Sequence, residues 1–160
     1  MKVVGVVGYP ASGKGEFSLI ADELGIPVIV MGDMIRRKVI QEELALTDEN
    51  IGAAARKLRS ELGMDAVAIL TAEEVRKLSS AIVVIDGIRG DAEVAYFRSV
   101  FSDFSLLAIT AGFETRLLRM QNRIYIEGNG FIFAYRSDVL ACDAQIIEAV
   151  DVRSFRYVGS

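Results

Sequence analysis

The stretch VVGYPASGKGEF, residues 6–17, decides the fold, because it joins an apolar strand to a helix through a glycine-rich turn. Gly8, Gly13 and Lys14 have the spacing G-x-x-x-x-G-K of a phosphate-binding loop. Residues 3–7, just before it, form a nearly continuous apolar run, as in a parallel strand covered on both faces. This context predicts that the backbone N–H groups of residues 12–15 hold phosphate oxygens at the positive end of the helix.

One position departs from the usual motif. A Ser or Thr normally follows the lysine and its hydroxyl holds magnesium, but this chain has Gly15 and then Glu16. A carboxylate at Glu16 predicts either a Mg²⁺ ligand, direct or through water, or a cap on the helix N-terminus. The alternative to phosphate binding is a glycine-rich strand–helix turn in which Lys14 is incidental.

Composition excludes several classes of function. The chain has 160 residues, is 52% apolar and 25% charged, and carries a net charge of −4, so a single globular domain without affinity for DNA or an acidic membrane is expected. It has no histidine, and its single cysteine, Cys142, predicts a small buried side chain rather than a nucleophile. The apolar start is too short for a signal or a membrane span. We therefore expect a soluble, cytoplasmic protein.

Strand-like and helix-like segments alternate along the chain. Further strands are predicted at residues 26–31, 81–85, 105–110 and, more weakly, 155–158. Helical spacing occurs at residues 15–24, 33–44, 48–62, 65–78, 91–101, 114–122 and about 138–150. This order predicts an α/β, three-layer P-loop-type fold: an open, parallel sheet of about five strands with helices on both faces. The helices within residues 32–80 exceed one crossover and predict an inserted, acceptor-binding subdomain at the carboxyl edge of the sheet.

Several segments in the same order resemble adenylate kinases. GYPASGKGE, residues 8–16, is similar to their phosphate-binding loop, in which Gly also follows the lysine and Thr usually comes next. VMGDMIRRKV (30–39) and LTDEN (46–50) resemble their AMP-binding region, VVIDGIRG (83–90) a strand ending in Asp-Gly before an Arg, and ETRLLRMQNR (114–123) the helix leading into the lid. The chain is most similar to an archaeal family of adenylate-kinase-related proteins, over residues 1 to about 123.

The resemblance implies two nucleotide sites and a metal. ATP would contact Gly8, Ala11, Ser12, Gly13, Lys14, Gly15, Glu16 and Arg119. The acceptor, AMP in the first place, would contact Gly32, Asp33, Arg36, Asp86, Gly87 and Arg89. Mg²⁺ would be held by Asp86 and Glu16. Lys14, Arg119 and Arg123 would be the catalytic side chains.

Each of the implied roles has a structural alternative. Arg36 and Arg89 would grip the acceptor phosphate, but Arg36 is otherwise an exposed helix arginine, as we expect for Arg37. Arg119 would stack on adenine and Arg123 would stabilise the transferring phosphoryl group, or both belong to a solvated basic stripe that includes Arg116. Asp86 and Asp33 are alternatively capping residues, and for Asp33 a cap on the following helix is at least as well supported.

The resemblance weakens beyond Arg123. Residues 124–137 are predicted to be a lid or a lid remnant, with Arg136 as a further basic candidate. The aromatic residues Phe131, Phe133 and Tyr135 are unusual for a solvated lid and suggest packing on the core or a partner surface.

Three functions follow from these patterns. The leading hypothesis is a nucleoside monophosphate kinase that transfers the γ-phosphoryl group of ATP to a mononucleotide. A dephospho-coenzyme A kinase-like enzyme is a second. The third is a nucleotide-binding switch or assembly ATPase that acts through a protein or ribonucleoprotein partner.

Overall fold

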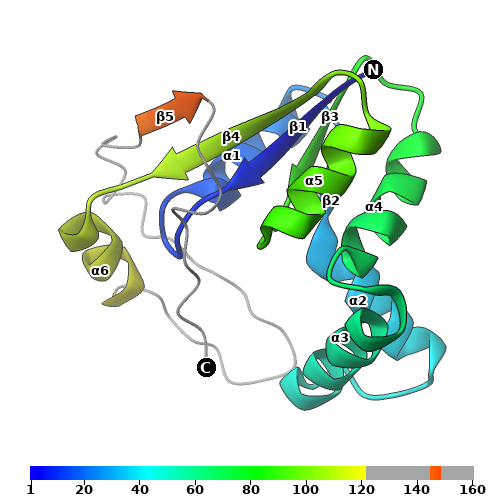
Figure 1. Ribbon diagram of the computed structural model, residues 1–160. Coiled ribbons are helices and arrows are strands. Elements are labelled where there is room, and N and C mark those ends of the chain that lie inside the picture. The colour runs from blue at the N-terminus through cyan, green and yellow to red at the C-terminus, as the bar shows by residue number, and fades with distance from the viewer. Residues whose placement is uncertain (122–144, 149–160) are drawn as a thin grey trace.

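The computed structural model describes residues 1–121 and 145–148 (Figure 1). Its sheet has the strand order β2-β3-β1-β4-β5. The strands are β1 (Lys2–Val7), β2 (Val28–Val30), β3 (Ile82–Asp86), β4 (Phe104–Thr110) and β5 (Gln145–Glu148). The first four pair in parallel, which confirms the predicted α/β sheet.

Helices cover both faces of this sheet, as predicted. Helix α1 (Lys14–Glu23) lies on one face, and α4 (Ala66–Arg76) and α5 (Asp91–Val100) lie on the other (Figure 1). Successive residues of β1 supply the two cores because side chains alternate across a strand. Val3 packs in the core that includes Phe97 of α5, whereas Val6 packs with Ala21 of α1. The three-layer arrangement follows directly from the apolar run that precedes the loop.

The predicted helix at about residues 138–150 is wrong for its described part. Residues 145–148 form β5, which pairs antiparallel with β4, with Ala108 opposite Ile147. Two adjacent β-branched residues, Ile146 and Ile147, favour an extended chain, and the free edge of β4 offers them a hydrogen-bonding partner. The sheet is therefore four parallel strands with an antiparallel edge strand. The strand predicted at 155–158 and Cys142 lie outside the described residues.

The segment predicted as an insertion forms α2 (Met31–Gln41), α3 (Asp48–Leu62) and α4. Helix α3 begins where the Thr47 hydroxyl accepts the N–H of Asn50 at 3.2 Å, an ordinary N-cap. Helices α2 and α3 lie beyond the carboxyl ends of β2 and β3 (Figure 1), whereas α4 contacts β2 and α5. Only α2 and α3 therefore stand off the sheet, and α4 belongs to its covering layer.

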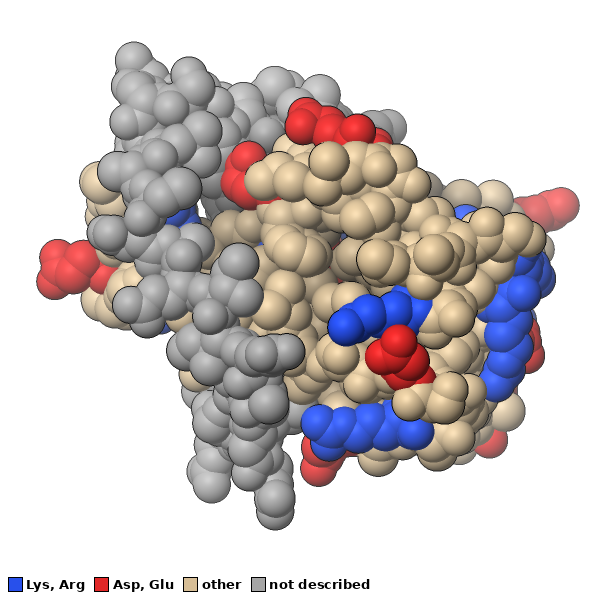
Figure 2. All heavy atoms as spheres, turned by 90° about the horizontal axis from the view of Figure 1, so that it is seen from above, with Lys and Arg blue, Asp and Glu red and all other residues tan. Residues whose placement is uncertain are grey.

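The described part of the face in Figure 2 is largely uncharged, and its Lys and Arg side chains lie beside acidic ones. Among the described residues, no helix has both the length and the apolar character needed to cross a membrane.

Candidate nucleotide-binding site

The register of the sheet brings the predicted site residues to one edge. Val6, Asp86 and Val30 lie side by side on β1, β3 and β2, and Val7 lies beside Ala108 of β4. The segments that follow these strands therefore leave the sheet together. They are the glycine-rich loop, the turn at residues 87–90, the start of α2 and the segment leading to α6 (Phe113–Gln121). Ligands of open parallel sheets bind at this carboxyl edge.

The loop has the backbone geometry that its glycines predict. Gly13 is the N-cap of α1 and has φ 110°, a backbone angle that residues other than glycine rarely adopt. A Cβ atom on Gly8 would lie 2.3 Å from the carbonyl oxygen of Ile109, so only glycine allows the loop to lie against the end of β4. No side chain caps α1 within the described part of the chain. The N–H groups of its first turn are therefore suited to an anion.

Lys14 folds back over this loop. Its Nζ donates hydrogen bonds to the carbonyl oxygens of Gly8 at 2.6 Å and of Tyr9 at 3.1 Å. The ammonium group is therefore held against the first residues of the loop.

Ser12 has an unusual environment within the same loop. Its side chain is 1% exposed, and its Oγ has no hydrogen-bond partner among the described residues. Buried hydroxyl groups without a partner are uncommon because they lose hydration without compensation. Together with the open backbone around Gly15, where a Cβ atom would have no atom of the described residues within 4 Å, this fits a loop built to hold a polar ligand.

Two carboxylates, at the end of β3 and in the first turn of α1, are the candidate metal ligands at this edge of the sheet. Asp86 ends β3, and its Oδ2 accepts a hydrogen bond from Ser18 Oγ at 3.2 Å. Glu16 lies half-buried in the first turn of α1 and has no hydrogen bond or ion pair with the other described residues, so it does not form the alternative helix cap. Mg²⁺ in phosphate-binding sites takes one or two carboxylates together with water and phosphate oxygens. Asp86 and Glu16 fit that set, although no group of three potential ligands occurs within residues 1–121 and 145–148.

Helix α6 is attached to the loop by two arginines. Arg119 is only 9% exposed, and its Nη1 donates to the carbonyl oxygen of Ala11 at 3.1 Å. The Arg116 guanidinium lies 4.8 Å from the ring centre of Tyr9, and its Nε donates to the carbonyl oxygen of Ala111 at 3.1 Å. The solvated-stripe alternative is therefore wrong for both side chains. Arg123, Arg136 and the predicted lid at 124–137 lie outside the described residues.

Sequence reasoning missed the contact between Tyr9 and Arg116. Their cation–π contact joins the loop to a helix that begins more than a hundred residues later, and no local pattern reports such a contact. The one available signal was the spacing of Arg116 and Arg119, which are three residues apart and therefore near each other on α6.

On the acceptor side, Arg36 pairs with Asp33 within α2. Their side chains are 2.5 Å apart and about half exposed. The predicted cap at Asp33 is wrong: α2 begins at Met31, with Val30 at the cap position, so Asp33 lies inside the first turn and turns to Arg36 instead. Gly32 lies beside the same guanidinium, 3.4 Å from Nη1 when measured from a built Cβ atom.

The turn after β3 carries the other acceptor candidates, Gly87 and Arg89. Gly87 has φ 97°, and the Arg89 side chain is exposed. A buried carboxylate holds this turn: Glu93 Oε2 accepts the backbone N–H of Arg89 at 2.8 Å and of Gly90 at 3.2 Å. Glu93 is 4% exposed, and burial raises its pKa above the ordinary value against the opposing effect of those two hydrogen bonds. The sequence signal for this support was Glu93 at the third position of a helix.

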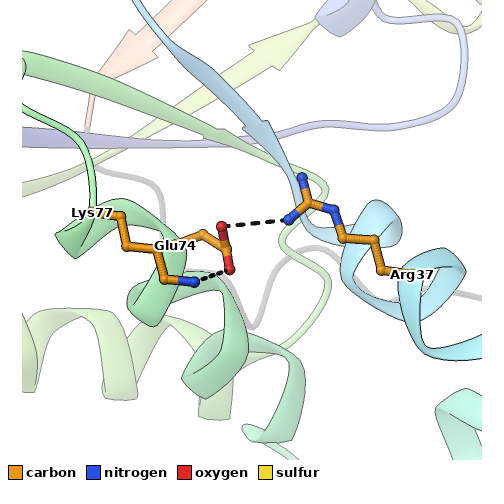
Figure 3. Close-up of polar contacts among 3 residues, drawn as sticks. All are labelled: Arg37, Glu74 and Lys77. Atoms are coloured by element: carbon orange, nitrogen blue, oxygen red, sulfur yellow. Dashed lines mark hydrogen bonds and ion pairs between the residues drawn. The ribbon is translucent and has the colours of Figure 1, made fainter. Parts of the chain in front are cut away.

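Arg37 points away from this group, toward α4. It pairs with Glu74 at 3.4 Å, and Lys77 pairs with the other oxygen of the same carboxylate at 2.6 Å (Figure 3). The hydrogen bond from Lys77, followed by the charges of Lys77 and Arg37, lowers the pKa of Glu74. Arg37 is 59% exposed, as expected, and connects α2 with α4.

Comparison with known proteins identifies the family of this chain. The model of an AAA domain family, AAA_18, matches residues 4–138. A UPF0200 protein of Methanoregula boonei is 58% identical over 123 residues, which are 77% of this chain and 68% of that protein. Another, of Methanothrix thermoacetophila, is 38% identical over 159 residues, or 99% of this chain and 80% of that protein.

A solved structure, TT1252 from Thermus thermophilus, has a similar fold. Its TM-score is 0.52 at 20% identity, over 79% of this chain and 74% of that one, so the likeness concerns the fold alone. The match to archaeal relatives confirms the family resemblance noted in the sequence. The chain belongs to the AAA_18 family of P-loop AAA domains and, within it, to the archaeal UPF0200 proteins.

Proposed function

We propose that this chain is an ATP-dependent nucleoside monophosphate kinase that transfers the γ-phosphoryl group of ATP to a mononucleotide, with AMP as the first candidate. One observation carries the proposal. The sheet register gathers the glycine-rich loop with Lys14, the end of β3 with Asp86, and the start of α2 with Arg36 at a single edge. A donor phosphate and an acceptor phosphate bound there would approach each other.

The chemistry requires little from the protein beyond position and positive charge. An oxygen of the acceptor phosphate attacks the γ-phosphorus, and the bond from that phosphorus to the β–γ bridging oxygen breaks, so ADP leaves with the electron pair. No protein nucleophile or histidine is needed. In our proposal, Lys14 and the N–H groups at the start of α1 bind the β- and γ-phosphates. Arg119 adds positive charge from α6, where its guanidinium group contacts the loop.

Mg²⁺ would neutralise the charge that develops on the phosphate oxygens. Asp86 and Glu16 are the side chains that we assign to it, because both carry carboxylates beside the loop. The acceptor phosphate is assigned to Arg36 and Arg89, whose planar guanidinium groups each bind two phosphate oxygens. Helices α2 and α3 would then form the acceptor-binding part of the molecule.

A coupled kinase assay across AMP, GMP, CMP, UMP and dephospho-coenzyme A tests the proposal. We expect turnover with AMP and its loss, by a factor of a thousand or more, in Lys14→Ala. Lys2→Ala is the matched control, because Lys2 begins β1 at the end opposite the loop and its side chain is exposed. If dephospho-coenzyme A is the only acceptor that is phosphorylated, it replaces AMP as the assigned acceptor. ATP hydrolysis without transfer to any acceptor would refute the kinase and favour the switch or assembly ATPase.

A further inference from the structure

The hydroxyl group of Ser18 makes an unusual contact for a helix serine. Three other hydroxyl groups in the described helices bond to the backbone of their own helix: Ser60 Oγ to Lys57 O, Thr71 Oγ1 to Val67 O and Ser99 Oγ to Tyr96 O, each at 2.7 Å. That local bond is the ordinary choice of such residues. Ser18 instead donates across to the sheet, to Asp86 Oδ2 at 3.2 Å.

The position of Ser18 on α1 explains how it reaches Asp86. Ser18 follows Lys14 by four residues, so the two lie on the same side of the helix, one turn apart. Asp86 is opposite Val6 in the sheet, only two residues before the loop begins. The contact therefore joins the helix that carries the lysine to the strand end that carries the carboxylate.

We propose that Ser18 is the positioning residue for the metal-binding carboxylate of Asp86. The proposal rests on the assignment of Mg²⁺-bound ATP to this site. At the usual position of a hydroxyl ligand the chain has Gly15, which has no side chain to offer. Ser18, one turn after Lys14, acts on the metal through Asp86 and is not itself a ligand.

The geometry also indicates what the contact does for Asp86. Oδ2 accepts the hydrogen bond, and neither Asp86 oxygen has another hydrogen-bond or ion-pair partner within the described ranges. Fixing one oxygen fixes the carboxylate plane, which leaves Oδ1 in a single orientation for a cation or its bound water. Residues that orient a metal ligand in this way typically change metal affinity by about 10- to 100-fold when they are removed.

Mn²⁺ binding, followed by electron paramagnetic resonance in the presence of ATP, tests the proposal without relying on turnover. We expect Ser18→Ala to weaken Mn²⁺ binding by about tenfold or more. ATP binding in EDTA, measured by calorimetry, should stay within twofold of wild type. Ser18→Thr keeps the hydroxyl group and should restore most of the metal affinity. Ser99→Ala, on α5, is the matched control, because its hydroxyl bonds only within its own helix.

The outcomes separate this inference from the proposed function. If wild type binds Mn²⁺ and ATP while Ser18→Ala binds both equally well, the role of Ser18 is refuted and the kinase proposal stands. If wild type binds no ATP, both are refuted. A loss of metal-free ATP binding that matches the loss of Mn²⁺ would show a merely structural serine. Should Ser18→Ala unfold, Ser18→Cys, which keeps the size but donates weakly, answers the same question.

Discussion

Arg119 Nη1 donates to the carbonyl oxygen of Ala11 at 3.1 Å and so joins α6 to a loop that lies 108 residues earlier in the chain. Ala11 has φ 61°, an uncommon conformation for a residue other than glycine. A buried guanidinium group needs hydrogen-bond partners, and this carbonyl is one of them. The contact therefore couples the shape of the phosphate-binding loop to the position of α6.

Arg119→Ala should weaken both the fold and the proposed ATP site. Loss of a hydrogen bond to a charged group costs about 1.5–3 kcal/mol, so the free energy of unfolding should fall by about that amount. ATP affinity should fall tenfold or more, because the loop and a nearby positive charge are both affected. Urea unfolding and calorimetric ATP binding measure the two effects. Arg98→Ala, an exposed position on α5, is the control, and equal behaviour of the two variants would contradict the role of Arg119.

Gly8→Ala should destabilise the protein by about 1–3 kcal/mol, the usual cost of forcing atoms into filled space. Its Cβ atom would lie 2.3 Å from Ile109 O and 2.7 Å from Ser12 Oγ, so the loop must move away from β4. Gly15→Ala is a matched comparison, because a Cβ atom there meets no atom within 4 Å in the part of the chain that the structure describes, and Ala favours a helix. Thermal unfolding of both variants measures the difference. A melting temperature for Gly8→Ala equal to that of Gly15→Ala would show that the close approach to Ile109 is not needed.

The predictable parts of this protein are those that local patterns determine. The loop, the four parallel strands and the helices on both faces follow from the glycine spacing and from apolar runs such as residues 3–7. Even the start of α3 at Asp48 follows from a local signal, the capping hydroxyl of Thr47.

Some of the parts that were missed depend on partners distant in sequence, and others depend on where a helix begins and how it packs. The strand at 145–148 is decided by the free edge of β4, and its own residues gave a helical pattern. The support of Ala11 by Arg119 and of the Arg89 turn by Glu93 depends on where α6 and α5 pack. The prediction that Asp33 caps a helix was wrong because α2 begins two residues earlier than its polar pattern indicates. Asp33 therefore lies inside the first turn and pairs with Arg36.

Arg36→Ala should lower AMP affinity by about 10- to 100-fold, which is the loss expected when one charge-assisted, bidentate contact with a phosphate is removed. Arg37→Ala is a close control, because the neighbouring side chain is similarly exposed, 59% against 51%, but pairs with Glu74 on α4. It should leave AMP affinity within twofold and change stability little, because ion pairs between exposed side chains contribute little. Calorimetric titration measures the AMP affinity of both variants, and urea unfolding measures their stability. Equal losses in the two variants would place the acceptor phosphate elsewhere.

Glu93 should make stability depend on pH in an unusual direction. Burial raises its pKa in the folded protein above the unfolded value of 4.5, so between those two pKa values the folded state binds more protons. Stability must therefore fall as pH rises through that window. Glu93→Gln keeps an acceptor for the N–H groups of Arg89 and Gly90 and should remove this part of the slope.

The control for that experiment is Glu93→Ala, which leaves both buried N–H groups without their acceptor and should cost about 1–3 kcal/mol at every pH. Urea unfolding of wild type and both variants from pH 4 to 8 provides the curves. If the curve for Glu93→Gln runs parallel to wild type throughout, the raised pKa of Glu93 is refuted.

Glu16→Gln should separate the metal from the phosphates. The Glu16 carboxylate lies half-buried in the first turn of α1, where Thr usually stands in the adenylate-kinase loop, and it has no hydrogen-bond or ion-pair partner in the described part of the chain. If it binds Mg²⁺, directly or through water, its loss weakens Mg²⁺-dependent ATP binding while AMP binding is unchanged. In EDTA the same carboxylate would repel the phosphates, so Glu16→Gln should then bind ATP more tightly than wild type.

Glu23→Gln, in the last turn of the same helix, is the control and should change neither ATP binding nor AMP binding. Calorimetry with ATP and AMP, each with Mg²⁺ and with EDTA, gives the comparison. An equal loss of ATP and AMP binding would show that Glu16 supports the fold of the loop and holds no metal ion, and Asp86 would remain as the sole carboxylate assigned to Mg²⁺.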